Sequence, residues 1–143
     1  MRVLGYATNG VADELALAML AHSLHDLPIV IEVNKTRLLA SDLVALVTSQ
    51  KVSVVCIADL PPSPPSKSRY LVKRLHAALP DVRIVVGRWS PASLADDSTQ
   101  ALRDAGAILV ASTLSETRDY LGNLVEIPRI PAPETGDPPV VAA

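Results

Sequence analysis

The stretch Val52–Ala58, VSVVCIA, and the loop Asp59–Ser66 that follows it, DLPPSPPS, decide the fold. The first segment carries no charged residue, and its length suits a strand rather than a membrane span. A continuous apolar run, as opposed to an alternating one, is typical of a strand that is covered on both faces. The sequence therefore predicts a central strand of a parallel sheet, followed by a stiff proline-rich turn.

Strand-like and helix-like segments alternate outward from this strand in both directions. Leucines at helical spacing, such as Leu17, Leu20 and Leu24, indicate helices, and prolines and glycines indicate where they end. Strands are predicted over Arg2–Ala7, Ile29–Val33, Val52–Ala58, Arg83–Gly87 and Ile108–Ala111, and helices, with their capping residues, over 11–26, 41–50, 66–79, 95–105 and 113–124.

Five strand–helix units in strict alternation predict an α/β domain, because right-handed helical crossovers leave successive strands parallel. We expect a three-layer, doubly wound, flavodoxin-like sheet of five parallel strands in the order 2-1-3-4-5. This domain is predicted to occupy residues 1–125. Residues 126–143 contain five prolines and no helical pattern, so they are predicted to form a proline-rich C-terminal tail outside the core.

The charge distribution excludes several classes of function. The net charge of the 143-residue chain is −2, and Glu126, Arg129, Glu134 and Asp137 place all of it in the predicted tail. A neutral body lacks the basic surface that binds nucleic acid. An aromatic fraction of 3% speaks against stacking of bases on aromatic rings.

The single cysteine and the short apolar runs indicate the cellular compartment of the chain. Cys56, the single cysteine, forms no disulfide and no cysteine-based zinc site, and its apolar neighbours predict a buried residue in a reducing compartment. The apolar runs are shorter than a membrane span, and Asp13 and Glu14 interrupt any signal-peptide pattern. We expect a soluble, cytoplasmic chain.

Ligands of doubly wound sheets bind at the carboxyl ends of the strands, which points to the loops that follow the predicted strands. No Walker-type glycine loop, dinucleotide fingerprint, nucleophile elbow or metal-ligand spacing is present, so we expect no catalysis, cofactor or metal. The candidate ligand-binding residues at this edge are Asn9, Gly10, Asp59, Ser63, Ser66, Lys67, Arg69, Arg88, Trp89, Ser112 and Thr113.

The helix after the proline loop begins with bases. Lys67 and Arg69 oppose the helix dipole, and no acid occurs between residues 60 and 80. A bound anion or an acidic partner would reverse that penalty, with Arg88 joining from the next strand end. The alternative is that these long side chains simply reach water.

Capping patterns give further predictions about the same loops. Asn9 or Thr8 is expected to cap the first helix, Ser41 the second, and Ser63 the third with Pro64 at its first position. Thr113 and Glu116 form a T-x-x-E capping box. Trp89 is either a ligand platform or, as we favour, a cover over the edge of the core.

The segment Val52–Trp89 resembles the soluble cytoplasmic extension of autoinducer-2 exporter-like permeases. The matching features are the buried strand, the Ser-Pro loop, the helix start Arg69–Leu75 (RYLVKRL) and the strand end Val86–Trp89 (VGRW). The resemblance implies a domain attached to, or working with, a transmembrane permease, and so a location at the inner membrane. A homodimer is left open.

Two further families share the predicted layout. Cobalamin-binding domains carry Asp-x-His-x-x-Gly after the first strand, whereas residues 9–14 here read NGVADE. Receiver domains carry a phosphoacceptor at the position of Asp59, but they also need an acidic pair after the first strand and a lysine after the fifth. This chain has Thr8-Asn9 and Ser112-Thr113 at those positions, so phosphotransfer is not expected.

We therefore expect a non-enzymatic regulatory or sensory domain associated with a membrane permease, which binds a small anionic ligand or an acidic partner at the strand-end crevice. The alternatives are a cofactor-binding module related to cobalamin-binding domains and an enzyme that uses Asp59 as an acid or base.

Overall fold

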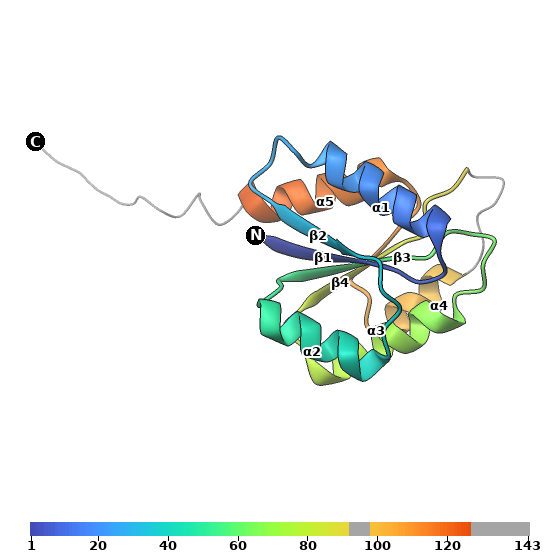
Figure 1. The fold of residues 1–143 in the computed structure, drawn as a ribbon. Helices are drawn as coiled ribbons and strands as arrows, with labels where there is room; N and C mark the ends of the chain where they lie inside the picture. The colour runs from blue at the N-terminus through green and yellow to red at the C-terminus, as the bar shows by residue number, and fades with distance from the viewer. Residues whose placement is uncertain (92–97, 127–143) are drawn as a thin grey trace, which may run out of the picture.

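The computed structural model describes residues 1–91 and 98–126. Strands and helices alternate throughout these ranges (Figure 1). The elements are β1 (Arg2–Ala7), α1 (Val11–Ser23), β2 (Val30–Asn34), α2 (Ala40–Gln50), β3 (Val54–Ala58), α3 (Ser66–Ala78), β4 (Arg83–Gly87), α4 (Ser98–Ala105), β5 (Leu109–Ala111) and α5 (Leu114–Glu126).

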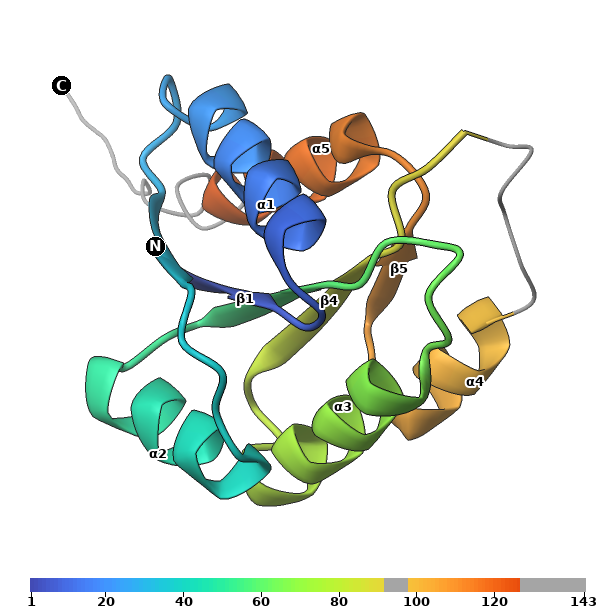
Figure 2. The same ribbon diagram turned by 45° about the vertical axis from the view of Figure 1, so that its right-hand side comes forward.

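The predicted fold class is confirmed. The sheet has the order β2-β1-β3-β4-β5, and every neighbouring pair of strands is parallel. Helices α1 and α5 cover one face of the sheet, and α2, α3 and α4 cover the other (Figures 1 and 2). The parallel register brings the carboxyl ends of β1, β3, β4 and β5 into one row through the pairs Ala7↔Ala58, Ala58↔Gly87 and Gly87↔Ala111.

Strand β3 is buried along its whole length, as the VSVVCIA segment predicts. Its side chains alternate between two aliphatic clusters, with Val55 and Ile57 under α2, α3 and α4, and Val54 and Cys56 under α1 and α5. Burial raises the pKa of the Cys56 thiol to about 12, so this cysteine stays a protonated small hydrophobic residue at neutral pH.

Several element boundaries differ from the predictions by a few residues. Helix α1 ends at Ser23 rather than near residue 26, because the Leu24 N–H bonds back to the Ala21 carbonyl in a tighter turn. Strand β2 begins at Val30, and β5 begins at Leu109. Helix α5 runs through Glu126, one residue past the predicted domain boundary. The predicted tail from residue 127 onward and the predicted helix residues 95–97 lie outside the described residues.

The predicted helix caps have mixed outcomes. Thr113 caps α5, since the Glu116 N–H donates to its Oγ1 at 3.1 Å while the Glu116 carboxylate accepts from the Ser112 N–H at 2.9 Å. Helix α4 ends at Ala105 before Gly106, whose φ of 131° confirms the predicted C-terminal glycine.

The other three predicted caps are wrong. Helix α2 begins after Leu39, helix α3 after Pro65 and helix α1 after Gly10, and none of these three N-cap positions has a capping side-chain hydrogen bond. Ser41 therefore lies inside the first turn of α2. Among the described helices, none is long and apolar enough to cross a lipid bilayer.

Candidate functional site

Backbone hydrogen bonds continue beyond the strand ends and hold the loops of the carboxyl edge together. The Thr8 N–H donates to the Ala58 carbonyl, and the Asp59 N–H donates to the Gly87 carbonyl. The Arg88 N–H bonds to the Ala111 carbonyl in the same way. Residues that follow β1, β3 and β4 are thus placed side by side, which no local pattern in the sequence specifies.

Asp59 lies at the centre of this edge and is fully buried. Its Oδ1 accepts a hydrogen bond from the Asn9 side-chain amide at 2.8 Å. Its Oδ2 accepts one from the Ser68 hydroxyl at 2.6 Å and lies 3.5 Å from Nη1 of Arg88. Both carboxylate oxygens are therefore occupied by groups of the protein itself.

Arg88 and Asn9 extend these bonds to the proline loop. Nη1 of Arg88 donates to the main-chain carbonyls of Asp59 and Ser63, at 3.1 and 2.9 Å. The Asn9 amide also donates to the Ser63 hydroxyl at 2.9 Å. The loop after β3 is thereby tied to the loops after β1 and β4.

Asp13 in the first turn of α1 completes the arrangement. Its Oδ2 accepts from the Asn9 main-chain N–H at 2.9 Å, and its Oδ1 accepts from the Leu60 N–H at 3.1 Å. A place in the first turn of a helix predicts only that this residue complements the helix dipole, but the carboxylate is buried and joins two loops. We call Asn9, Asp13, Asp59, Ser63, Ser68 and Arg88 the Asp59 cluster.

Burial dominates the electrostatics of Asp59. Loss of water raises its pKa above the ordinary value of 3.8, while the hydrogen bond from Ser68 and the charge of Arg88 lower it, and the net shift is upward. Asp13 adds a smaller upward contribution. A carboxylate without exposure or a spare oxygen is poorly placed to attack a substrate or to hold a metal ion. The described residues contain no group of three histidine, cysteine or carboxylate side chains that could hold a metal ion.

The structure brings four of the predicted site residues into this cluster: Asn9, Asp59, Ser63 and Arg88. Arg88 differs from the expectation of an exposed cation, because it is buried between Asp59 and the loop carbonyls. Asp13 and Ser68 were not among the predicted residues. The signal for Asp13 was its position at the third residue of a helix, from which a carboxylate can reach back to the preceding loop.

Trp89 turns away from the crevice. Its ring lies over Gly87 so closely that a Cβ there would clash, and its indole N–H donates to the Thr117 hydroxyl on α5 at 2.9 Å. It belongs to the aliphatic cluster under α1 and α5, as the interpretation of a core cover predicts. Ser112 and Thr113 are exposed and shape the start of α5, and Gly10 precedes α1 with φ of 141°.

Ser66, Lys67 and Arg69 lie exposed in the first turns of α3, as the sequence predicts. Lys67 lines a pocket between α3 and the start of α2. Arg37, Tyr6 and Thr8, which also line it, were not among the predicted site residues. No sequence motif identifies them, because the pocket exists only once β1, α2 and α3 are packed together.

The sequence matches no protein family model, and no curated protein is significantly similar to it. Solved structures with the same fold include a CheY-like protein, TadZ, from Pseudomonas aeruginosa, with 18% identity, a TM-score of 0.63, and coverage of 95% of this chain and 99% of that one. A signal receiver domain of an HD domain-containing protein from Pseudomonas fluorescens has 18% identity, a TM-score of 0.59, and coverage of 88% and 87%.

A cobalamin-binding protein from Desulfitobacterium hafniense also shares the fold. It has 10% identity and a TM-score of 0.67, and the match covers 85% of this chain and 58% of that one. Likeness at such identities establishes the fold, and the chemistry must be argued from the site itself.

Proposed function

We propose that this protein is a non-enzymatic regulatory domain of receiver-like fold that works by binding and does not accept a phosphoryl group. The observation that carries the proposal is the state of Asp59, which is fully buried and has both carboxylate oxygens occupied by Asn9, Ser68 and Arg88. An aspartate must expose one oxygen to attack a phosphoryl donor. In this domain hydrogen bonds from Asn9 and Ser68 take up the two oxygens instead.

The carboxyl edge supports binding of an anionic ligand or an acidic partner segment. Lys67 and Arg69 are exposed at the start of α3, whose N-terminus has no capping side chain, so negative charge is favoured there. Ser68, between them, donates to Asp59. A ligand that moves the start of α3 would therefore act directly on the Asp59 cluster and on the loop that the cluster holds.

The partner that we propose is a membrane permease at the cytoplasmic face of the inner membrane, as the resemblance of Val52–Trp89 implies. An acidic cytoplasmic segment of a permease has the charge that this basic edge would bind.

Treatment with acetyl phosphate and Mg²⁺, followed by intact-mass measurement, tests the first part of the proposal. We expect no added phosphoryl group, in the wild-type protein as in Asp59→Asn. Stoichiometric phosphorylation that Asp59→Asn abolishes would overturn the proposal.

Sedimentation with inner-membrane vesicles that contain or lack the permease tests the partner. We expect binding only to vesicles with the permease, and its loss in Lys67→Glu/Arg69→Glu. The matched control, Lys51→Glu/Arg103→Glu, changes the charge equally at exposed residues near the other ends of α2 and α4 and should bind as the wild type does. Equal binding by both double variants would contradict the role of the basic edge.

A second candidate function is a cofactor-binding module, which the shared fold with a cobalamin-binding protein favours. It predicts a saturable change in the visible spectrum when the protein is mixed with hydroxocobalamin. Because the loop after β1 has no histidine to reach the cobalt, we expect no such change at high micromolar cofactor, and a saturable change would establish this candidate instead.

A further inference from the structure

A pocket of about 340 Å³ opens at the carboxyl edge of the sheet, beside the Asp59 cluster. Its floor comes from the end of β1 and the residue after it, and its walls come from the β2–α2 connection and the first turns of α2 and α3. Figure 2 shows α2 and α3 side by side under the sheet, where these walls meet. The pocket is lined by Tyr6, Thr8, Arg37, Leu38, Leu39, Ala40, Asp42, Lys67, Tyr70 and Leu71.

Positive charge predominates at this pocket. Arg37 and Lys67 are exposed on opposite walls, and neither side chain forms an ion pair or a hydrogen bond with any described residue. Asp42 is the one acid in the lining. The N-termini of α2 and α3 both lack a capping side chain, so their first N–H groups add partial positive charge to the walls.

A buried hydroxyl in the lining has no partner. Thr8 is 6% exposed, and its Oγ1 is the single side-chain oxygen in the pocket lining that is buried without a hydrogen bond. Burying a hydroxyl without a partner is unfavourable. A bound molecule with an oxygen at this depth would remove that cost.

The remaining lining is apolar and firmly held. It includes Leu38, Leu39, Tyr70 and Leu71. The Tyr6 hydroxyl bonds to the main chain of Leu38 twice, donating to the carbonyl at 3.3 Å and accepting from the N–H at 3.0 Å. These bonds fix the β2–α2 connection over the end of β1, so the wall is preformed.

We propose that this pocket binds a small organic anion, namely one carboxylate or phosphate group attached to a compact apolar body. The anionic group would lie between Lys67, Arg37 and the Thr8 hydroxyl, and the apolar body would lie against Leu39 and Leu71. The volume is near the lower end for small-molecule sites, so it suits a single-ring or short-chain acid better than a nucleotide or a macrocycle. This inference rests on the proposed function, because it names the ligand class of the same edge.

Titration of the isotope-labelled full chain, followed by amide NMR, tests the proposal with four probes. Benzoate and phenyl phosphate combine the anion with a ring, inorganic phosphate lacks the ring, and benzyl alcohol lacks the charge. We expect saturable shifts at Thr8, Ala40 and Lys67 with one or both ring anions, and binding about tenfold weaker or more for the other two. The stronger of the two ring anions identifies the head group.

Two variants and their controls make the test specific. Lys67→Glu should weaken binding of the better probe about tenfold or more, whereas Lys73→Glu on the exposed face of α3 should change it by less than about twofold. Thr8→Val should weaken binding about threefold or more while leaving the midpoint of urea unfolding unchanged or higher, because the methyl group replaces a buried hydroxyl without a partner.

The absence of saturable shifts, equal binding of inorganic phosphate, or shifts confined to α1 would overturn this proposal. Each of these results is compatible with retained binding to permease-containing vesicles, in which case the proposed function stands and an acidic partner occupies the edge. Conversely, binding of benzoate or phenyl phosphate at these amides by a protein that acetyl phosphate also modifies would retain the pocket and overturn the proposed function.

Discussion

Asp59 shows, at the scale of single residues, how one carboxylate connects three loops. Its two oxygens take hydrogen bonds from Asn9 in the loop after β1 and from Ser68 in α3, and Arg88 approaches from the end of β4. Each donor favours the charged form, yet burial outweighs them and the pKa is raised. Asp59 is therefore a structural hydrogen-bond acceptor whose charged form is less favourable than that of an exposed aspartate.

This balance predicts a pH dependence of stability. A pKa raised in the folded state means that the folded protein holds the proton more tightly than the unfolded chain does. The resulting stabilisation is complete below the ordinary aspartate pKa of 3.8 and is lost as the pH rises through the raised value. We expect the free energy of unfolding of the wild type, minus that of Asp59→Asn, to be larger at pH of about 4 than at about 7.

Urea unfolding of both proteins over this pH range measures the difference. Comparing the two proteins at each pH cancels the titration of the acids that do not interact with Asp59, provided that Asp59→Asn keeps the native amide spectrum. A difference that stays constant or grows with rising pH would contradict the upward shift of the Asp59 pKa.

At the scale of elements, the helix N-termini at the carboxyl edge fall into two kinds. Helix α5 has its own cap in Thr113 and Glu116, and α1 uses Asp13 to bond the loop before it. The N-termini of α2 and α3 have no capping side chain, and these two face the pocket that we assign to an organic anion. The N-termini of α2 and α3 are therefore open to a ligand, whereas the Asp13 carboxylate already lies at the start of α1.

Alanine substitution distinguishes a real cap from a predicted one. Thr113→Ala should lower the free energy of unfolding by about 1 kcal/mol, because the Glu116 N–H loses its acceptor. Ser41→Ala, at the predicted cap that lies inside α2 instead, should stay within about 0.5 kcal/mol of the wild type. Urea unfolding compares the two, and equal losses would show that the Thr113 bond contributes nothing of its own.

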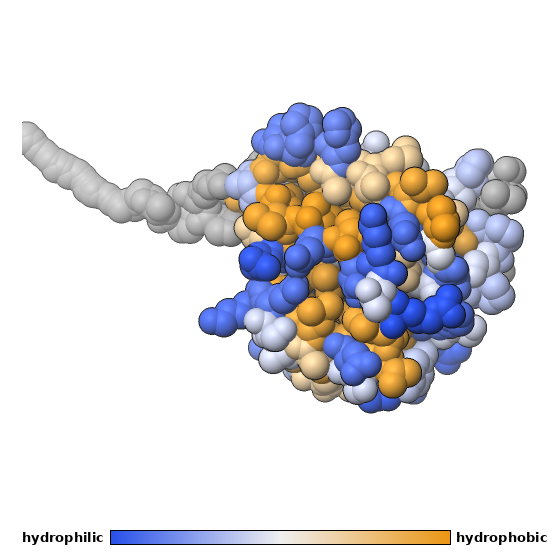
Figure 3. All heavy atoms as spheres, viewed as in Figure 1, coloured by the Kyte–Doolittle hydropathy of each residue, from blue (hydrophilic) through white to orange (hydrophobic). Residues whose placement is uncertain are grey.

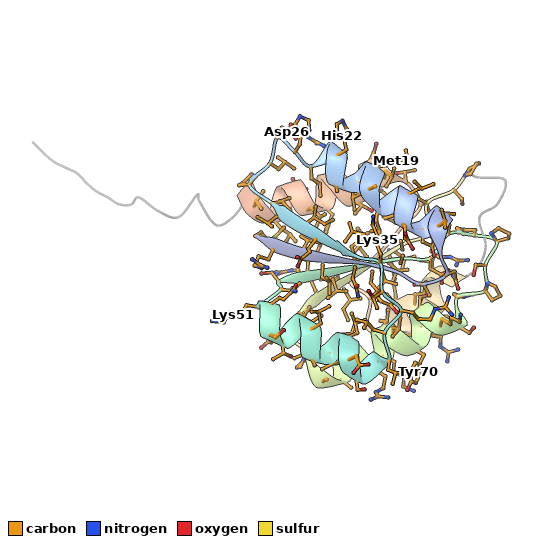
Figure 4. All side chains as sticks on the ribbon, in the orientation of Figure 1. Met19, His22, Asp26, Lys35, Lys51 and Tyr70 are labelled. Atoms are coloured by element: carbon orange, nitrogen blue, oxygen red, sulfur yellow. The ribbon has the colours of Figure 1, made fainter. Side chains whose placement is uncertain are left out.

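At the scale of the whole molecule, the parallel three-layer arrangement collects polar loops at one edge and leaves apolar residues on one helix. Val11, Leu15 and Met19 follow each other along the outer side of α1, each more than half exposed. Figure 3 shows hydrophobic surface at the upper right, over α1, and Figure 4 shows Met19 projecting outward from it. If two copies of the chain associate, the homodimer that the sequence left open, these exposed side chains of α1 offer an apolar surface for the contact.

Removal of the predicted tail tests the domain boundary. A chain that ends at Glu126 keeps all of α5 and should unfold within about 0.5 kcal/mol of the full chain in urea, since the tail is predicted to lie outside the core. Its formal net charge should change from −2 to −1, because Arg129, Glu134 and Asp137 are removed while Glu126 stays. A clear loss of stability would place tail residues in the folded core.

The sequence by itself determined the architecture. The alternation of strand-like and helix-like segments around a charge-free central strand predicts a doubly wound parallel sheet, and the rules of strand connection then give its order. The burial of Cys56 and the Thr113 cap were also predicted from the residues around them. These features are predictable because each strand, helix and cap is specified mainly by residues close in sequence, and few ways of connecting such segments are allowed.

Only the tertiary structure decided what the carboxyl edge of the sheet contains. Asn9 and Asp59 are 50 residues apart in sequence, and Tyr6 and Leu38 are 32 apart, so their hydrogen bonds depend on strand register and not on any local signal. Folding turned Arg88 from an expected surface cation into a buried partner of Asp59. It likewise created the pocket beside Lys67, because the chemistry of a side chain is set by neighbours that packing brings to it from distant parts of the chain.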